Sequence, residues 1–144
     1  MFDKLTEKAR QAILKAQEYV RQKEQQDVQI AHLIKGMMDV EDSIVLFLLK
    51  KMNVDVGAFT NRLALIMETY PKVYGGQNFG SHLSKSASKA IQDAASLAKD
   101  FGDEYVALDM IFAAVLTVKN DKAVKLLKSM GANEKDLALS LIHI

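Results

Sequence analysis

Apolar residues recur at every third or fourth position through most of this 144-residue chain, the spacing that places them on one face of a helix. The first such stripe predicts a helix that starts near Leu5 and ends at about Lys23. It consists of Leu5, Ala9, Ala12, Ile13, Ala16 and Val20. Because so many of these positions are alanine, we expect a neighbouring helix to approach this one closely. No run of alternating apolar and polar residues predicts a β-strand.

The same pattern returns 78 positions further along the chain. The residues Leu5, Ala9, Ala12, Ile13, Ala16 and Val28 are matched at this offset by Leu83, Ala87, Ala90, Ile91, Ala94 and Val106. Without a change of offset, Leu48, Leu49, Lys50, Met52 and Leu63 are matched by Leu126, Leu127, Lys128, Met130 and Leu141. One unit of about sixty residues therefore occurs twice, as a tandem duplication.

Each unit carries three more helical stretches. The predicted pairs are residues 30–38 with 108–116, residues 43–52 with 121–130, and a fourth helix bearing Phe59 and Leu63 or, in the second copy, Leu137 and Leu141. We therefore expect an all-α fold of about eight helices in which two four-helix units are related by a pseudo-twofold axis.

Residues at the predicted helix ends recur in type, even where they differ in identity. Thr6 and Ser84 are residue types that cap the start of a helix. Asn53 and Gly131 are the types that best tolerate the left-handed conformation at a helix end. The caps expected for the two fourth helices are Asp55 and Asn133.

The two copies are joined by a segment rich in turn residues. Residues 69–82 hold the only proline of the chain and three of its seven glycines, and we expect mobility around Gly75 and Gly76. This gives one domain over residues 1–144, with repeat one at about 5–66, a linker at about 69–82 and repeat two at about 83–144.

Charge and composition exclude several classes of partner. Residues 1–72 carry 11 Lys and Arg against 10 Asp and Glu, and residues 73–144 carry 8 against 8, so neither half predicts the basic face of a nucleic-acid-binding protein. There is no cysteine, and no apolar stretch long enough for a membrane span or a secretory leader. We expect a soluble, cytoplasmic protein that binds neither nucleic acid nor membrane.

The residue patterns of common active sites are missing. Gly75 and Gly80 have the glycine spacing of a phosphate-binding loop, but Ser81 and His82 stand where such a loop needs lysine and a hydroxyl residue. The histidines are too far apart in sequence to suggest a metal site, and His32 is interpreted as a core or boundary residue. We expect no metal, no cofactor and no enzymatic activity in this chain.

With these features in place, the chain resembles the N-terminal domain of Clp ATPases, and within that family most closely the disaggregase ClpB. The segments that carry the resemblance are 4–9 (KLTEKA), 30–38 (IAHLIKGMM), 47–54 (FLLKKMNV), 71–76 (PKVYGG) and 102–106 (GDEYV). It extends from residue 2 to about residue 139, and the last residues depart from the family pattern.

The resemblance implies a role in handling polypeptides. In such ATPases this domain captures unfolded or aggregated protein, and separate modules, absent from this chain, bind ATP and form a hexameric ring that threads the captured chain. Adaptor proteins and the Hsp70 system are further partners that it implies for the full-length protein. We expect the isolated domain to be a monomer. The alternative is an N-domain of the ClpA or ClpC type, which docks adaptors for a peptidase.

The resemblance and the duplication together indicate the binding residues. The family pattern places substrate handling at Thr6, Asp103, Tyr105, Val106 and Asp109, and the apolar residues Phe101 and Leu108 lie in the same segment. At the offset of 78, Asp103 and Asp109 correspond to Gln25 and Ala31, so the repeated fold does not demand their acidity. Structural roles stay open: Thr6 as a helix cap, and Asp109 as an acid in a first helical turn. Phe2 and Phe79 are further candidates to cover such a groove.

Overall fold

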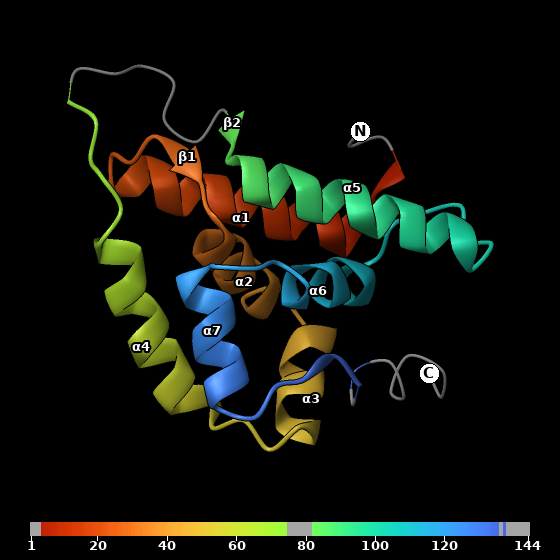
Figure 1. The fold of residues 1–144 in the computed structure, drawn as a ribbon. Coiled ribbons are helices and arrows are strands. Elements are labelled where there is room, and N and C mark those ends of the chain that lie inside the picture. The colour runs from red at the N-terminus through yellow and green to blue at the C-terminus, as the bar shows by residue number, and fades with distance from the viewer. Residues whose placement is uncertain (1–3, 75–81, 136, 138–144) are drawn as a thin grey trace.

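The computed structural model describes residues 4–74, 82–135 and 137, and over these residues the fold is all-α apart from two very short strands. In chain order the elements are α1 (Glu7–Gln22), β1 (Asp27–Val28), α2 (Ile30–Met38), α3 (Ile44–Lys51), α4 (Val56–Glu68), β2 (His82–Leu83), α5 (Lys85–Asp100), α6 (Leu108–Leu116) and α7 (Lys122–Ser129). Figure 1 shows α1 and α5 crossing one side of the molecule in opposite directions, with α2 and α6 beneath them and α3, α4 and α7 on the other side.

The predicted helices agree closely with this description. Both α2 and α6 have the predicted bounds, and α3 and α7 lie one residue inside theirs at each end. The described residues contain seven helices, whereas eight were predicted. Glu134, Lys135 and Leu137 are helical and would belong to the eighth, but the rest of that helix, including Leu141, lies outside the described residues.

The predicted helix ends are confirmed by their hydrogen bonds and dihedral angles. The hydroxyl of Thr6 accepts a hydrogen bond from the backbone N–H of Ala9 at 3.2 Å, and Ser84 does the same for Ala87 at 3.1 Å. After α3 and α7, Asn53 and Gly131 adopt φ angles of 62° and 117°, the left-handed region expected of them. The capping residues and the residues in the left-handed conformation therefore mark where these helices begin and end.

The all-α prediction is confirmed, but the described residues also contain two very short strands that no alternating pattern predicted. The strands β1 and β2 pair in parallel, with Val28 opposite Leu83. Leu5 forms an isolated parallel bridge with Val106. Two-residue strands are too short to produce an alternating pattern, which is why the sequence did not reveal them.

These two pairings are the same contact in the two copies, and each joins one copy to the other. The N–H of Thr6 donates to the carbonyl of Val106 at 3.0 Å, and the N–H of Ser84 donates to the carbonyl of Val28 at 2.9 Å. In each case the residue before the first helix of one copy bonds to the segment before the second helix of the other. One continuous hydrophobic cluster also contains buried residues from both copies.

The predicted close approach of helices is confirmed between α1 and α2. Ala9, Ala12 and Ala16 have no exposed surface. Gly36 of α2 lies against α1 so closely that a Cβ atom added to it would be only 2.2 Å from the carbonyl oxygen of Ala12. Small residues on both helices therefore allow backbone to pack against backbone.

The interpretation of His32 as a core residue is also confirmed. His32 is fully buried, its Nδ1 accepts from the N–H of Gln29 at 2.9 Å, and its Nε2 lies 2.7 Å from Oε1 of Gln25. Because Nδ1 is an acceptor, Nε2 carries the proton and donates it. Burial, and to a smaller extent the charge of Lys23, lower the pKa of His32 to about 4, so the ring is neutral at pH 7.

Some predictions concern residues that are not described, and others concern a membrane-spanning helix or a metal site. The residues Phe2, Gly75, Gly76, Phe79 and His143 are not described. Within the described ranges, none of the helices is both long and apolar enough to cross a bilayer, and no group of three potential metal ligands is found.

Candidate functional site

An open groove of about 410 Å³ lies where the starts of three helices meet. The first turns of α1, α3 and α6 border it. The residues that line it are Thr6, Glu7, Lys8, Asp42, Ile44, Ala107, Leu108 and Asp109. Three of these, Thr6, Leu108 and Asp109, were predicted from the sequence as binding residues.

Apolar groups from two helices form one part of this groove. Ile44 is half-buried at the start of α3, and Leu108 is almost fully buried at the start of α6. Ala107 precedes α6 as its N-cap residue and offers no side-chain hydrogen bond there. These side chains provide apolar surface to which a bound apolar group could be transferred from water.

Polar and charged groups surround the apolar part. Asp109 accepts a hydrogen bond from the N–H of Met110 at 2.9 Å, and Glu7 lies 3.7 Å from Arg10 as an exposed ion pair. Asp42 is exposed in the turn between α2 and α3 with a φ angle of 52°. Glu7 and Asp109 lie in first helical turns, where the helix dipole favours an acid.

The hydroxyl of Thr6 is already used as a helix cap, as the structural interpretation predicted. Its backbone N–H is used as well, because it bonds to the carbonyl of Val106. What Thr6 offers to the groove is therefore its methyl group, the O–H donor and the remaining lone pair of the hydroxyl. The described residues that line the groove include one hydroxyl, from Thr6, and the carboxylates of Glu7, Asp42 and Asp109.

The other predicted residues do not line this groove. Val106 is buried, and its backbone bridges to Leu5 beneath the start of α1. Phe101, Asp103 and Tyr105 lie on the exposed turn between α5 and α6. Phe101 and Tyr105 keep 57% and 49% of their surface exposed, which makes them two of the six large apolar side chains of the described residues that face solvent.

Sequence reasoning missed Glu7, Lys8, Asp42, Ile44 and Ala107. Glu7 and Lys8 follow Thr6 directly, and Ala107 precedes Leu108, so their proximity to predicted residues was a usable signal. Asp42 and Ile44 are more than 30 residues from either segment, and only the tertiary structure brings them to the groove.

Comparisons with known proteins assign a family to this architecture. Residues 4–130 match the family model described as the Clp repeat (R) N-terminal domain. The chaperone protein ClpB of Bacteroides thetaiotaomicron is 33% identical over 140 residues, which is 94% of this chain and 15% of that protein. The ClpB of Porphyromonas gingivalis is 35% identical over 130 residues, or 90% of this chain and 15% of that protein. The chain thus spans about one seventh of the length of these curated relatives.

Solved structures share the fold. The Hsp104 N-terminal domain from Candida albicans has a TM-score of 0.81 at 19% identity, covering 96% of this chain and 89% of that one. The N-terminal domain of the caseinolytic protease associated chaperone ClpD from Arabidopsis thaliana has a TM-score of 0.74 at 20% identity, covering 100% and 97%. On the sequence match, the chain belongs to the Clp repeat N-terminal domain family, the N-terminal domains of the Clp ATPases.

Proposed function

We propose that this chain is the polypeptide-capturing N-terminal domain of a ClpB-like disaggregase, and that the groove at the starts of α1, α3 and α6 is where unfolded or aggregated protein binds. The full-length protein would supply the ATPase modules and assemble as a hexamer in the cytoplasm. The isolated domain would be a monomer.

One observation carries the proposal. Thr6 is distant in sequence from the adjacent residues Leu108 and Asp109, and the three line one groove together with apolar Ile44. An open groove with an apolar part and polar edges suits a client of variable sequence, since such a surface requires no precise complementarity. The groove offers limited contact area, so we expect a dissociation constant of tens of micromolar or weaker for an isolated domain. Several domains in one ring would raise avidity by about 10² to 10⁴.

An amide-resolved NMR titration with an unfolded, non-aggregating polypeptide tests the proposal. Supporting shifts would cluster on the groove residues, and Asp109→Asn would weaken binding by about two- to tenfold, with a loss of stability of no more than about 0.3–1 kcal/mol from the helix dipole. Thr6→Ser keeps the helix cap and removes only the methyl group, so it separates a binding role of Thr6 from its structural one. The matched control is Asp93→Asn, an exposed acid on α5 outside the groove.

Three outcomes would contradict the proposal. An absence of shifts at millimolar polypeptide would remove the binding function. Equal weakening by Asp93→Asn and Asp109→Asn would remove the assignment to the groove. Nanomolar affinity for a single domain would refute the expectation of weak binding that several domains reinforce.

A second candidate function is the docking of an adaptor, as in an N-domain of the ClpA or ClpC type. The observation that favours it is the exposed pair Phe101 and Tyr105, because aromatic side chains often anchor protein interfaces. Binding of a folded partner that is lost in the double variant Phe101→Ser and Tyr105→Ser, with unfolded polypeptide binding unchanged, would support it.

A further inference from the structure

The turns that follow α1 and α5 have the same backbone geometry. Glu24 and Gly102 both adopt the left-handed conformation, with φ angles of 54° and 75°. The next N–H in each turn donates to a carbonyl five residues earlier, at 3.0 Å for Gln25 and 2.8 Å for Asp103. The first-copy turn is therefore a structural template for the second-copy turn.

An extended segment of the chain occupies the first-copy turn. Lys72 pairs with Gln25 as an antiparallel bridge, and the N–H of Val73 donates to the carbonyl of Glu24 at 2.8 Å. This segment follows α4 and leads from the first copy to the second. It adds to the turn as a strand adds to the edge of a sheet.

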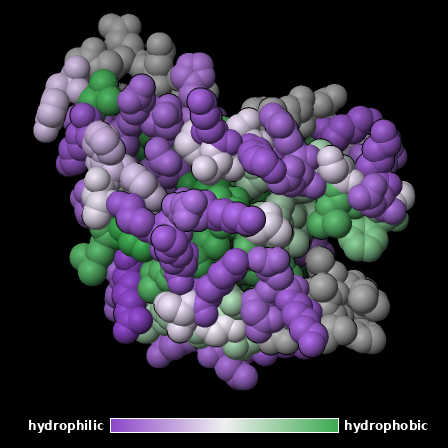
Figure 2. Space-filling view, viewed as in Figure 1, coloured by the Kyte–Doolittle hydropathy of each residue, from purple (hydrophilic) through white to green (hydrophobic). Residues whose placement is uncertain are grey.

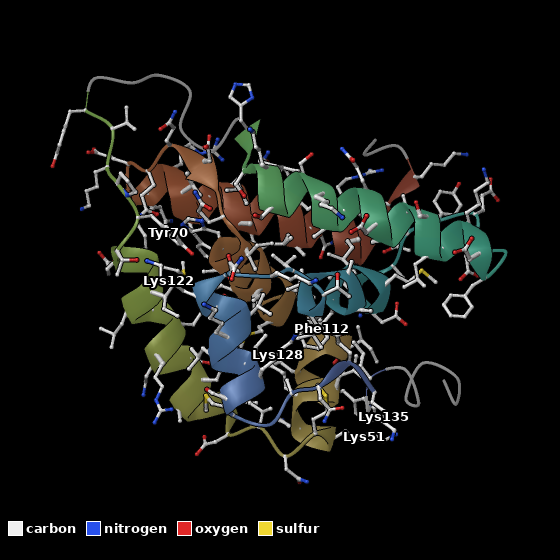
Figure 3. The ribbon with its side chains drawn as sticks, in the orientation of Figure 1. Lys51, Tyr70, Phe112, Lys122, Lys128 and Lys135 are labelled. Carbon is white, nitrogen blue, oxygen red and sulfur yellow. The ribbon has the colours of Figure 1, made fainter. Side chains whose placement is uncertain are left out.

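Side chains hold the same segment in place. The side-chain amide of Gln25 donates to the carbonyl of Met67 at 2.6 Å and lies 3.4 Å from the carbonyl of Tyr70. The ring of Tyr70 lies 5.3 Å from that of His32, centroid to centroid. The ammonium of Lys122 covers Tyr70 from outside at 5.3 Å, and Figure 3 shows the two side by side at the end of α4.

Among the described residues, nothing occupies the equivalent place in the second copy. The carbonyl of Gly102 accepts no hydrogen bond there, and a Cβ atom added to Gly102 would meet no atom within 4 Å. The carboxylate of Asp103 is exposed and takes part in no hydrogen bond or ion pair within the described ranges.

We propose that the second-copy turn binds an extended polypeptide segment by strand addition, in the way that residues 70–73 bind to the first-copy turn. This inference rests on the proposed polypeptide-binding function and adds a second contact beside the groove. A backbone N–H of the client donates to the carbonyl of Gly102.

The difference between Gln25 and Asp103 sets a preference among segments. The amide of Gln25 donates to carbonyls, whereas a carboxylate only accepts. Asp103 therefore favours a client that brings a donor to this position, such as the ammonium of a lysine or the guanidinium of an arginine. The preferred client is an extended segment that carries a basic residue.

The chain itself provides the probe for a test. A capped peptide with the sequence of residues 69–74 (TYPKVY) is titrated into the 144-residue protein and followed by amide-resolved NMR. We expect shifts at residues 101–105. N-methylation of the peptide residue that corresponds to Val73 removes the donor and should weaken binding at least fivefold, whereas N-methylation at the position of Tyr74 should not.

Weaker peptide binding by a variant could result from a loss of fold, so a variant that is expected to bind more tightly is the stronger test. The variant Asp103→Gln restores the amide with which Gln25 donates to the carbonyl of Tyr70 and should bind the peptide about three to ten times more tightly. No change in affinity in this variant would overturn the proposal, as would an equal effect of both N-methylations.

The remaining outcomes separate this proposal from the one on which it rests. If unfolded polypeptide shifts the groove residues but the peptide leaves residues 101–105 unshifted, strand addition is wrong and the groove stands. If neither ligand produces shifts, both proposals fail. If residues 101–105 shift with protein concentration alone, and light scattering shows a dimer, the occupant is a second copy of this chain and the client assignment is overturned.

Discussion

The structure predicts that the substitution Gly36→Ala lowers the free energy of unfolding. An alanine in a helix interior is ordinarily favoured over glycine by about 1 kcal/mol. Here the added Cβ would lie 2.2 Å from the carbonyl oxygen of Ala12, more than 1 Å short of ordinary contact. Both groups belong to helical backbone, so neither can rotate away.

The expected loss follows from separating α1 and α2. A gap of 0.5–1 Å removes about a quarter to a half of the dispersion energy of the atoms at an interface. Overpacking a dense core typically costs about 1–3 kcal/mol, and backbone contact places this site at the upper end. Allowing for the gain in helix propensity, we expect a net destabilisation of about 2 kcal/mol, or a lowering of Tm by roughly 4 to 10 °C.

Gly57→Ala is the matched control. Gly57 is also helical, in the first turn of α4, but its added Cβ would approach nothing closer than the side chain of Asp55 at 3.6 Å, an ordinary contact. This variant should be neutral or up to about 1 kcal/mol more stable than the wild type. Urea unfolding followed by circular dichroism measures both. A Gly36→Ala protein as stable as Gly57→Ala would refute the reasoning.

Two further predictions concern the buried histidine and the helix caps. The pKa of His32 is lowered from 6.5 to about 4, so the contribution of the neutral ring to stability is complete above pH 6.5 and is lost as the pH falls through 4. Between pH 7 and pH 4, urea unfolding should show the wild type losing up to about 3 kcal/mol more of its free energy of unfolding than His32→Gln. Parallel curves for the two proteins would contradict this. Ser84→Ala and Thr6→Ala each remove a cap and should lower the free energy of unfolding by about 0.5–2 kcal/mol, measured in the same way. Only Thr6→Ala should also weaken polypeptide binding in the NMR titration, since Ser84 lies outside the groove; equal weakening by both would make Thr6 purely structural.

The helices were predictable because the residues that determine each helix lie within it or at its ends. Residues 30–38 and 108–116 carry an apolar pattern with clear ends, and the structure begins and ends α2 and α6 at those residues. The left-handed residues Asn53 and Gly131 were predictable for the same reason, since few residue types accept that conformation. Duplication strengthened each of these predictions by supplying a second, independent example.

The contacts between distant segments were not predictable. Val28 and Leu83 pair across 55 residues, and a strand of two residues leaves no periodic trace. Asp42 reaches the groove only because α2 and α3 pack against α6, which no local pattern reports. The same limit applies to Phe101 and Tyr105: they are near Leu108 and Asp109 in sequence, but the fold places them on an exposed turn outside the groove.

Large apolar side chains are exposed at separate places on the surface of the described residues. Figure 2 shows one face that is largely hydrophilic, with apolar residues exposed between the polar ones and no broad apolar patch on that face. Exposed Leu14, Phe47 and Leu65 are distributed over α1, α3 and α4. Single exposed apolar side chains of this kind are ordinary on protein surfaces and do not by themselves indicate a binding site.

Leu5 pairs with Val106 and Val28 pairs with Leu83, so each copy of the repeat contributes a segment that pairs with the other copy. A solitary copy would leave the segment before its first helix unpaired. Two identical copies could satisfy each other by trading those segments, which is the arrangement of a swapped dimer. The present chain has that arrangement with its two partners fused end to end, and a nick between them should leave two fragments that stay associated without a covalent bond.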